Sequence, residues 1–264
     1  MPKGLDKLAG GVGKAIETVP DLYDDALKPA TQESGKTLAL IPRAINAALI
    51  PLRQWIAERE YKLAETEKLL AKKLENVAED KIVTPEAYVA VPAIQAISYS
   101  MDSEELRNLY ANLLAKAMNS DTKDMVHPAY TNIISQMTPL EAKVLHYISN
   151  EPEQDIPIID LIAYRTLQNK MQYITLQTNI TSLDMGNIKY IAISLDNLSR
   201  NNLLYISEDT FTNGYEKIYN SQQYRDFYNT QRNNIPKPYT DINAIKKIGR
   251  LTDFGKSFCQ ICIN

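Results

Sequence analysis

The stretch that decides the fold is residues 102–148, DSEELRNLYANLLAKAMNSDTKDMVHPAYTNIISQMTPLEAKVLHYI. Asp102 is a candidate N-cap, and Glu105 three residues later fits a capping box. A second helix is predicted from Thr138, because a cap is followed by Pro139 at the first helical position and Glu141 at the third. The first helix has an apolar stripe at helical spacing. Its members are Leu106, Leu109, Tyr110, Leu113, Leu114 and Ala117.

The link and the segments upstream are also predicted to be helical. His127-Pro128 could open a short helix between the two capped ones. Thr84-Pro85-Glu86 begins a helix that runs to about Ser100 and is bent by Pro92. Residues 54–80 carry apolar residues at roughly heptad spacing, which is typical of a bundle helix or of a helix that forms a homo-oligomer.

Residues 1–35 are predicted to be a flexible leader, because four of the nine glycines fall within the first 13 residues. The following segment, 36–56, is apolar, but Arg43 and Arg53 interrupt it and leave too short a run to span a bilayer. Together with Trp55 it either packs on the rest of the fold or contacts a membrane or a partner. The N-terminus lacks the apolar stretch of a signal peptide, so we expect a cytoplasmic protein, with peripheral membrane association as an alternative.

The charge of the chain is uneven although its net value is only -3. Residues 76–160 hold 13 acidic and 5 basic residues, whereas residues 187–264 hold 10 basic and 7 acidic ones. The basic bias of the last third is compatible with nucleic-acid contact or with an ordinary solvated surface. The two cysteines, Cys259 and Cys262, lack further ligands nearby in sequence and are expected to be reduced and buried.

The composition and the hydrophobic periodicity of the sequence change after Ser149. Residues 158–184 are polar and show no clear period, and we expect an irregular, partly helical region there. A helix is predicted for 187–202, followed by a short strand at 203–206. Residues 215–219 could pair with that strand across Asn213-Gly214 as a hairpin. A strand near 244–248 and a last helix capped by Thr252 complete the chain.

A helix followed directly by a strand, with a closing Leu-Thr-x-x-Gly segment, resembles a winged helix. Winged helices bind DNA through a basic recognition helix, but many serve as protein-interaction modules, which we favour here because Asp196 lies on the helix. Tyrosines are frequent from residue 205 onward and suit a packed core, a protein interface or stacking on single-stranded nucleic acid. They are Tyr205, Tyr215, Tyr219, Tyr224, Tyr228 and Tyr239. The candidate nucleic-acid contacts are Lys189, Arg200, Arg225, Lys246 and Lys247.

Several segments together resemble the bacterial Abi-alpha (abortive infection alpha) family. They are WIAEREYKLAETEKLLAKKLENV, VTPEAYVAVPAIQAISY, ELRNLYANLLAKAMN, HPAYTNIISQMTPLEAKVL and RLTDFGKSFCQIC. The resemblance covers residues 36–150 well and the C-terminus in outline. It implies resistance to bacteriophage, in which an infected cell is sacrificed or arrested, and it brings no catalytic residues.

The residues themselves offer no catalytic constellation. The two histidines, His127 and His146, have no Ser, Cys or Asp partner at a catalytic spacing. A P-loop is absent, and the acidic groups are explained as helix-start residues or loop residues. We therefore expect a protein that is not an enzyme and needs no cofactor or metal.

The expected fold is mainly α, with a helical domain at 36–135 followed by a winged-helix-like α+β domain at 136–264. The expected function is phage resistance through binding, with a phage or host protein as partner. The alternatives are nucleic-acid binding by the winged-helix region and a membrane-active effector that uses residues 36–56.

Overall fold

The structure is a computed structural model that describes residues 63–99, 103–208 and 212–263. The chain divides into two compact units, 1–40 and 41–264, and all described residues belong to the second. The expected leader, the 36–56 segment, and Arg43, Arg53 and Trp55 lie outside the described residues.

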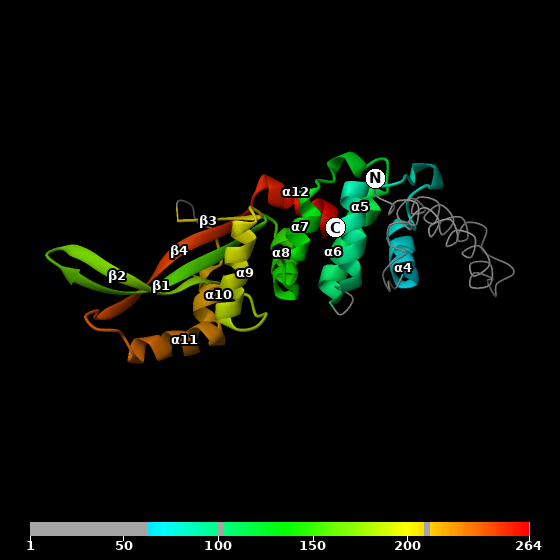
Figure 1. The fold of residues 1–264 in the computed structure, drawn as a ribbon. Helices are drawn as coiled ribbons and strands as arrows, with labels where there is room; N and C mark the ends of the chain where they lie inside the picture. The colour runs from blue at the N-terminus through cyan, green and yellow to red at the C-terminus, as the bar shows by residue number, and fades with distance from the viewer. Residues whose placement is uncertain (1–62, 100–102, 209–211, 264) are drawn as a thin grey trace, which may run out of the picture. The chain divides into compact units, whose positions relative to one another are not determined.

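Helices and strands alternate only in the second half of the described chain (Figure 1). The helices are α4 (Leu63–Leu74), α5 (Ala87–Tyr99), α6 (Glu104–Ala117), α7 (Ala129–Ser135), α8 (Pro139–Asn150), α9 (Ile188–Arg200), α10 (Tyr215–Asn220), α11 (Gln222–Asn233) and α12 (Asp253–Cys262). The strands are β1 (Asp155–Leu167), β2 (Lys170–Ile180), β3 (Leu204–Ser207) and β4 (Asp241–Leu251).

The helix starts predicted around residues 102–148 are largely confirmed. At α8, Thr138 and Glu141 form a complete capping box with Pro139 in the first turn. At α6 the N-cap is Ser103, whose hydroxyl accepts a hydrogen bond from Leu106 N at 3.3 Å, and not Asp102. Local hydrogen bonding therefore sets where these helices begin.

Helix α6 is the centre of the helical part. It packs against α4, α5, α7, α8 and α12, and most of its residues are buried. Leu70 and Leu74, which belong to the predicted 54–80 helix, are buried in the same core. The C-terminal helix α12 returns to this core, so the two ends of the described chain are joined by packing rather than separated by a linker.

The second half of the chain is built on a four-stranded antiparallel sheet with the order β2-β1-β4-β3. The long pairing of β1 with β4 runs from Asp155↔Arg250 to Tyr164↔Asp241. Strand β3 pairs with the end of β4 next to α12, from Leu204↔Leu251. Strand β2 forms one edge of the sheet and β3 the other.

Helices cover both faces of this sheet. Since side chains alternate along a strand, Ile158 packs in the core that contains α9, while Ile159 packs with Tyr215 and Ile218 of α10. A sheet buried on both sides needs apolar residues on both faces, and β1 is accordingly an almost continuous buried run from Asp155 to Ala163.

The mainly α, winged-helix-like expectation is wrong. The fold is mixed, with strands of up to 13 residues. Residues 158–184, expected to be irregular and partly helical, form most of β1 and β2, and this hairpin precedes α9. Residues 215–219 form α10 instead of a hairpin strand, and β3 pairs with β4, which follows it only after two helices.

The positive φ of Gly214, 94°, would suit a strand turn, but here the residue is the N-cap of α10. The buried residues that follow, Tyr215 and Ile218, have the spacing of a helix face, so burial of this face favours a helix over a strand. The other predicted elements of this half, α9, β3, β4 and an α12 capped by Thr252, are confirmed.

Within the described part of the chain, the helices fall short of the length and apolar character needed to cross a bilayer.

Candidate functional site: an exposed β-arm

The hairpin β1–β2 extends beyond the rest of the sheet. The pairing of β4 with β1 ends at Tyr164, so residues 165–167 pair with β2 alone. The turn between the two strands is Gln168-Asn169, whose φ angles of 50° and 61° fit the left-handed conformation of a two-residue hairpin turn. We call residues 164–174 the β-arm.

The β-arm exposes large apolar side chains. Leu167 is 50% exposed, Met171 52%, Tyr173 51% and Ile174 36%. A two-stranded hairpin has marginal stability in water, and contiguous exposed apolar groups commonly mark interaction sites. No other described segment covers the strands of the β-arm or these apolar side chains, so the β-arm has the features of an interaction surface.

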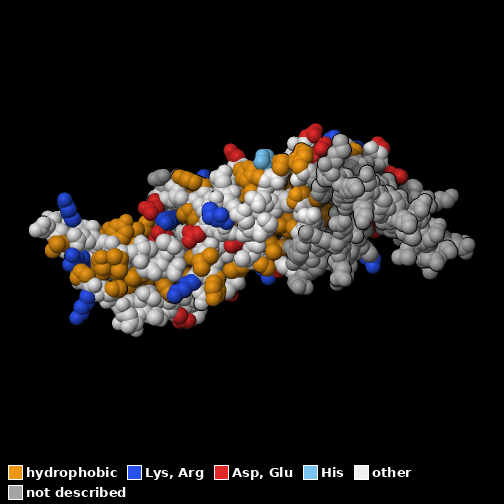
Figure 2. All heavy atoms as spheres, in the orientation of Figure 1, with side chains coloured by type: hydrophobic (Ala, Val, Ile, Leu, Met, Phe, Trp, Pro, Cys, Tyr) orange, Lys and Arg blue, Asp and Glu red, His pale blue; other side chains and the backbone are white. Residues whose placement is uncertain are grey.

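The outer part of the β2 edge, from Met171 to Thr175, has little protection against another strand. Natural edge strands are usually blocked by charged residues, prolines or bulges. From Met171 to Thr175 β2 contains no charge and no proline and pairs with β1 in regular register, whereas register shifts interrupt the pairing between Thr175 and Ile180. The hairpin end of the face seen in Figure 2 gathers hydrophobic and basic side chains.

The charge of this region has one sign. Residues 164–178 contain Arg165 and Lys170 and no acidic residue. The guanidinium of Arg165 donates to Gln172 Oε1 across the hairpin at 2.9 and 2.7 Å, which leaves its positive charge uncompensated by any ion pair among the described residues. The β-arm is thus apolar and basic.

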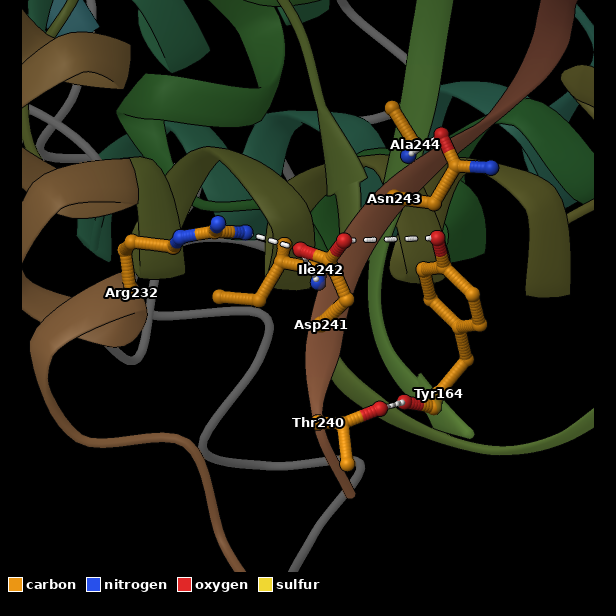
Figure 3. Close-up of polar contacts among 7 residues, drawn as sticks. All are labelled: Tyr164, Arg232, Thr240, Asp241, Ile242, Asn243 and Ala244. Carbon is orange, nitrogen blue, oxygen red and sulfur yellow. Dashed lines mark hydrogen bonds and ion pairs between the residues drawn. The ribbon is translucent and has the colours of Figure 1, made fainter. Parts of the chain in front are cut away.

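A polar cluster fixes the base of the β-arm (Figure 3). Tyr164 Oη donates to Asp241 Oδ2 at 3.5 Å, and Arg232 of α11 pairs with the other oxygen, Oδ1. The Tyr164 carbonyl accepts from Thr240 N at 3.0 Å. The backbone N–H of Ile242 and the Arg232 guanidinium hold the pKa of Asp241 below its usual value. One carboxylate thus ties β1, β4 and α11 together.

The five predicted nucleic-acid contacts do not share one surface. Lys246 and Lys247 are successive residues of β4 and face opposite sides of the sheet. Lys246 Nζ lies 5.0 Å from the ring centroid of Tyr215, and Lys247 pairs with Asp160 at 2.6 Å. Both cations therefore contact another side chain of the fold, Lys247 in a largely buried pair and Lys246 at the surface.

The remaining three lie on helices. Arg200 donates to Asn197 Oδ1 and Gln136 Oε1, which fastens α9 to the chain before α8. Arg225 donates to Asn220 Oδ1 and to the Tyr219 carbonyl. Lys189 is exposed in the first turn of α9.

The tyrosine-rich segment forms part of the core. Tyr215 and Tyr224 are buried, and Tyr224 has ring contacts with Tyr219 and Tyr228 at centroid distances of 5.6 and 5.8 Å. Burial raises the pKa of Tyr224 to about 12. The exposed tyrosine of the β-arm, Tyr173, belongs to a different element.

The His127 and cysteine side chains, which by residue type are possible catalytic or metal-binding groups, pack within the fold. His127 Nδ1 accepts from Ala129 N at 3.1 Å, and its ring packs on Tyr130 and Phe254. Cys259 and Cys262 are free and buried, as expected, and burial raises the pKa of the Cys259 thiol to about 12. Among the described residues, no group of three or more His, Cys, Asp or Glu side chains could hold a metal ion.

Sequence reasoning missed the β-arm. A signal was available, because residues 162–167 and 171–176 are two short runs rich in β-branched, aromatic and aliphatic residues on either side of Gln168-Asn169. The turn lacks glycine, and the polar residues within the runs hid their alternation.

A comparison with known protein families matches residues 58–262 to the family described as abortive infection alpha. The match includes both strands of the β-arm and continues through α12. No curated protein and no solved structure matches the chain. Since the match covers most of the sequence, the chain belongs to the abortive infection alpha family, which links it to phage defence by abortive infection.

Proposed function

We propose that this chain acts in phage defence by binding another protein through the β-arm rather than by catalysis. The observation that carries the proposal is the uncharged stretch from Met171 to Thr175 at the edge of β2, which exposes the side chains of Met171 and Tyr173. An unpaired strand edge can accept an additional strand through main-chain hydrogen bonds, and neighbouring side chains then select the sequence that binds.

The partner is an extended segment of a phage or host protein. Its backbone pairs with β2 and its apolar side chains cover Met171 and Tyr173. Because Arg165 and Lys170 are the charged residues of the β-arm, the segment carries acidic residues near the hairpin turn. The other edge strand, β3, has four residues and offers a much shorter template.

The internal contacts of the basic residues favour a protein partner over nucleic acid. Lys247, Lys246 and Arg200 are each engaged with another side chain of the fold. A nucleic-acid surface needs several cations on one face that can reach phosphates. Lys189 and the β-arm cations lie on different elements.

The test is phage challenge of cells that express the double variant Met171→Lys/Tyr173→Lys. Lysines on an edge strand oppose pairing with a further strand. We expect phage plaquing to rise to the level of cells without the protein, while the purified variant keeps its melting temperature, because both side chains are already half exposed.

The matched control is Tyr190→Lys/Ile193→Lys on the outer face of α9. These residues are 65% and 59% exposed, so the control adds the same charge at equally exposed apolar positions. We expect it to protect as well as the unaltered protein. Full protection by the β-arm variant would refute the proposal, as would equal loss in the α9 control.

A further inference from the structure

A concave site, separate from the β-arm, lies in the helical part. It is a cavity of about 520 Å³ between α6 and α8, closed at one side by the end of α12. Its size falls in the range of small-molecule sites. Apolar side chains line it together with amides. The apolar ones include Leu109, Ala142, Met185 and Ile263.

Two asparagines one helical turn apart on α6 present amide groups to this cavity. The Asn108 side chain is half buried and makes no hydrogen bond with any described residue. Asn112 is 8% exposed, and its Nδ2 donates to the carbonyls of Cys262 at 2.8 Å and Ile263 at 3.2 Å. These bonds fix the Asn112 amide and leave its Oδ1 as an acceptor without a partner in the described chain.

The unpartnered atoms of both amides are accessible to water, since neither residue has a buried polar atom that lacks a partner, and a ligand can replace that water. Asn108 offers a donor and an acceptor side by side, and Asn112 adds an acceptor. Their complement is a planar group with an amino donor next to a ring-nitrogen acceptor. Asparagine recognises adenine through this bidentate pairing.

The charges around the cavity do not favour an anion. Lys143 Nζ is paired with Glu105 at 3.0 Å, which holds the pKa of that carboxyl below its usual value. Glu151 also lines the cavity and accepts a hydrogen bond from Tyr147. Because Lys143 is neutralised by Glu105 and Glu151 adds a negative charge, a phosphate group gains little binding energy in this cavity.

We propose that this cavity binds the base of a nucleoside that carries an amino group next to a ring nitrogen, as adenine and cytosine do. Asn108 pairs with that edge, Asn112 Oδ1 accepts from the amino group, and Leu109 and Met185 contact the ring. The inference goes beyond the proposed protein contact and does not depend on it.

The test is calorimetric titration of the full chain with adenosine, cytidine, uridine and adenosine 5′-monophosphate. We expect saturable binding of adenosine or cytidine, weaker binding of uridine, and no gain in affinity from the phosphate. Asn108→Leu and the shape-conserving Asn108→Asp should each weaken binding about tenfold or more, because each removes the amide donor. Asn132→Leu, at an exposed position of α7 away from the cavity, should bind like the unaltered chain.

The melting temperature of each variant shows whether it is folded. Failure of both adenosine and cytidine to saturate would overturn the proposal, and so would equal affinity for uridine. Unchanged affinity in both Asn108 variants would overturn the assignment of that residue. Markedly tighter binding of the monophosphate would show that the site recognises phosphate instead of the base.

Discussion

Lys247 of β4 and Asp160 of β1 form an ion pair within the sheet, with Nζ 2.6 Å from Oδ2 and side chains only 16% and 9% exposed. The other carboxylate oxygen accepts from Asn179 N at 2.9 Å, and Asn179 Nδ2 donates to Asp196 of α9 at 2.6 Å. This network uses Lys247, a candidate nucleic-acid contact, to neutralise a buried carboxylate.

Replacing Lys247 by Met should destabilise the protein by about 3 kcal/mol, because it leaves Asp160 buried without its counter-charge. Chemical denaturation measures the loss. Lys246→Met is the matched control, since the adjacent lysine is exposed over Tyr215 and should cost less than about 1 kcal/mol. Equal effects of the two substitutions would contradict the assigned role of the pair.

Gly255→Ala should be severely destabilising, by about 3 kcal/mol, because a Cβ there would lie 2.0 Å from the carbonyl oxygen of Leu203. The close approach lets α12 pack against the chain entering β3. Gly249→Ala is the comparison, since its Cβ would meet Ile158 Cδ1 at 2.6 Å, the end of a side chain that can move. Thermal and chemical denaturation should show that the Gly255→Ala variant is clearly less stable than the Gly249→Ala variant.

Cys259 and Cys262 should resist a thiol reagent in the native protein and both react once it is unfolded. Burial raises the pKa of the Cys259 thiol to about 12 and that of Cys262 well above 9.0, so native thiolate is scarce at neutral pH. Both thiols favour folding below the unfolded pKa near 9.0, and this contribution is lost as pH rises through the folded pKa. Rapid labelling under native conditions would contradict the burial.

Asp241→Asn should loosen the base of the β-arm without unfolding the protein. The substitution removes the charge that Arg232 binds, so hydrogen exchange should quicken in residues 226–233 and 240–242. The lowered pKa of Asp241 means that its contribution is present above the unfolded pKa and is lost as pH falls through the folded one. The control is Asp226→Asn. Asp226 lies on α11, as Arg232 does, and accepts a hydrogen bond from Gln222, so its substitution should leave exchange in these residues unchanged.

The helices around residues 102–148 were predictable because their signals are local. Thr138, Pro139 and Glu141 satisfy backbone groups within one turn, and the apolar stripe of α6 needs only the helical period. The start of α6 shifted by one residue because Asp102 and Ser103 are both good caps, and hydrogen-bond geometry chose between them.

The β-arm and the α6–α8 cavity could not be predicted from local sequence signals in this way. Strand pairing joins residues far apart in the chain, as in Tyr164↔Asp241, and neither segment carries a signal for the other. At the cavity, Asn112 contacts Cys262 at the end of α12, which lies 150 residues further along the chain. Both candidate sites depend on such contacts.

The sequence by itself determined family membership, the capped helices, the buried cysteines, the position of α9 and the start of α12, since these depend on residue types at short spacing. Tertiary structure decided which strands pair, which face of β4 each lysine occupies and which tyrosines are buried. The physical reason is that a strand satisfies its backbone with a distant partner. The same residues can therefore form an edge or a core depending on what packs beside them.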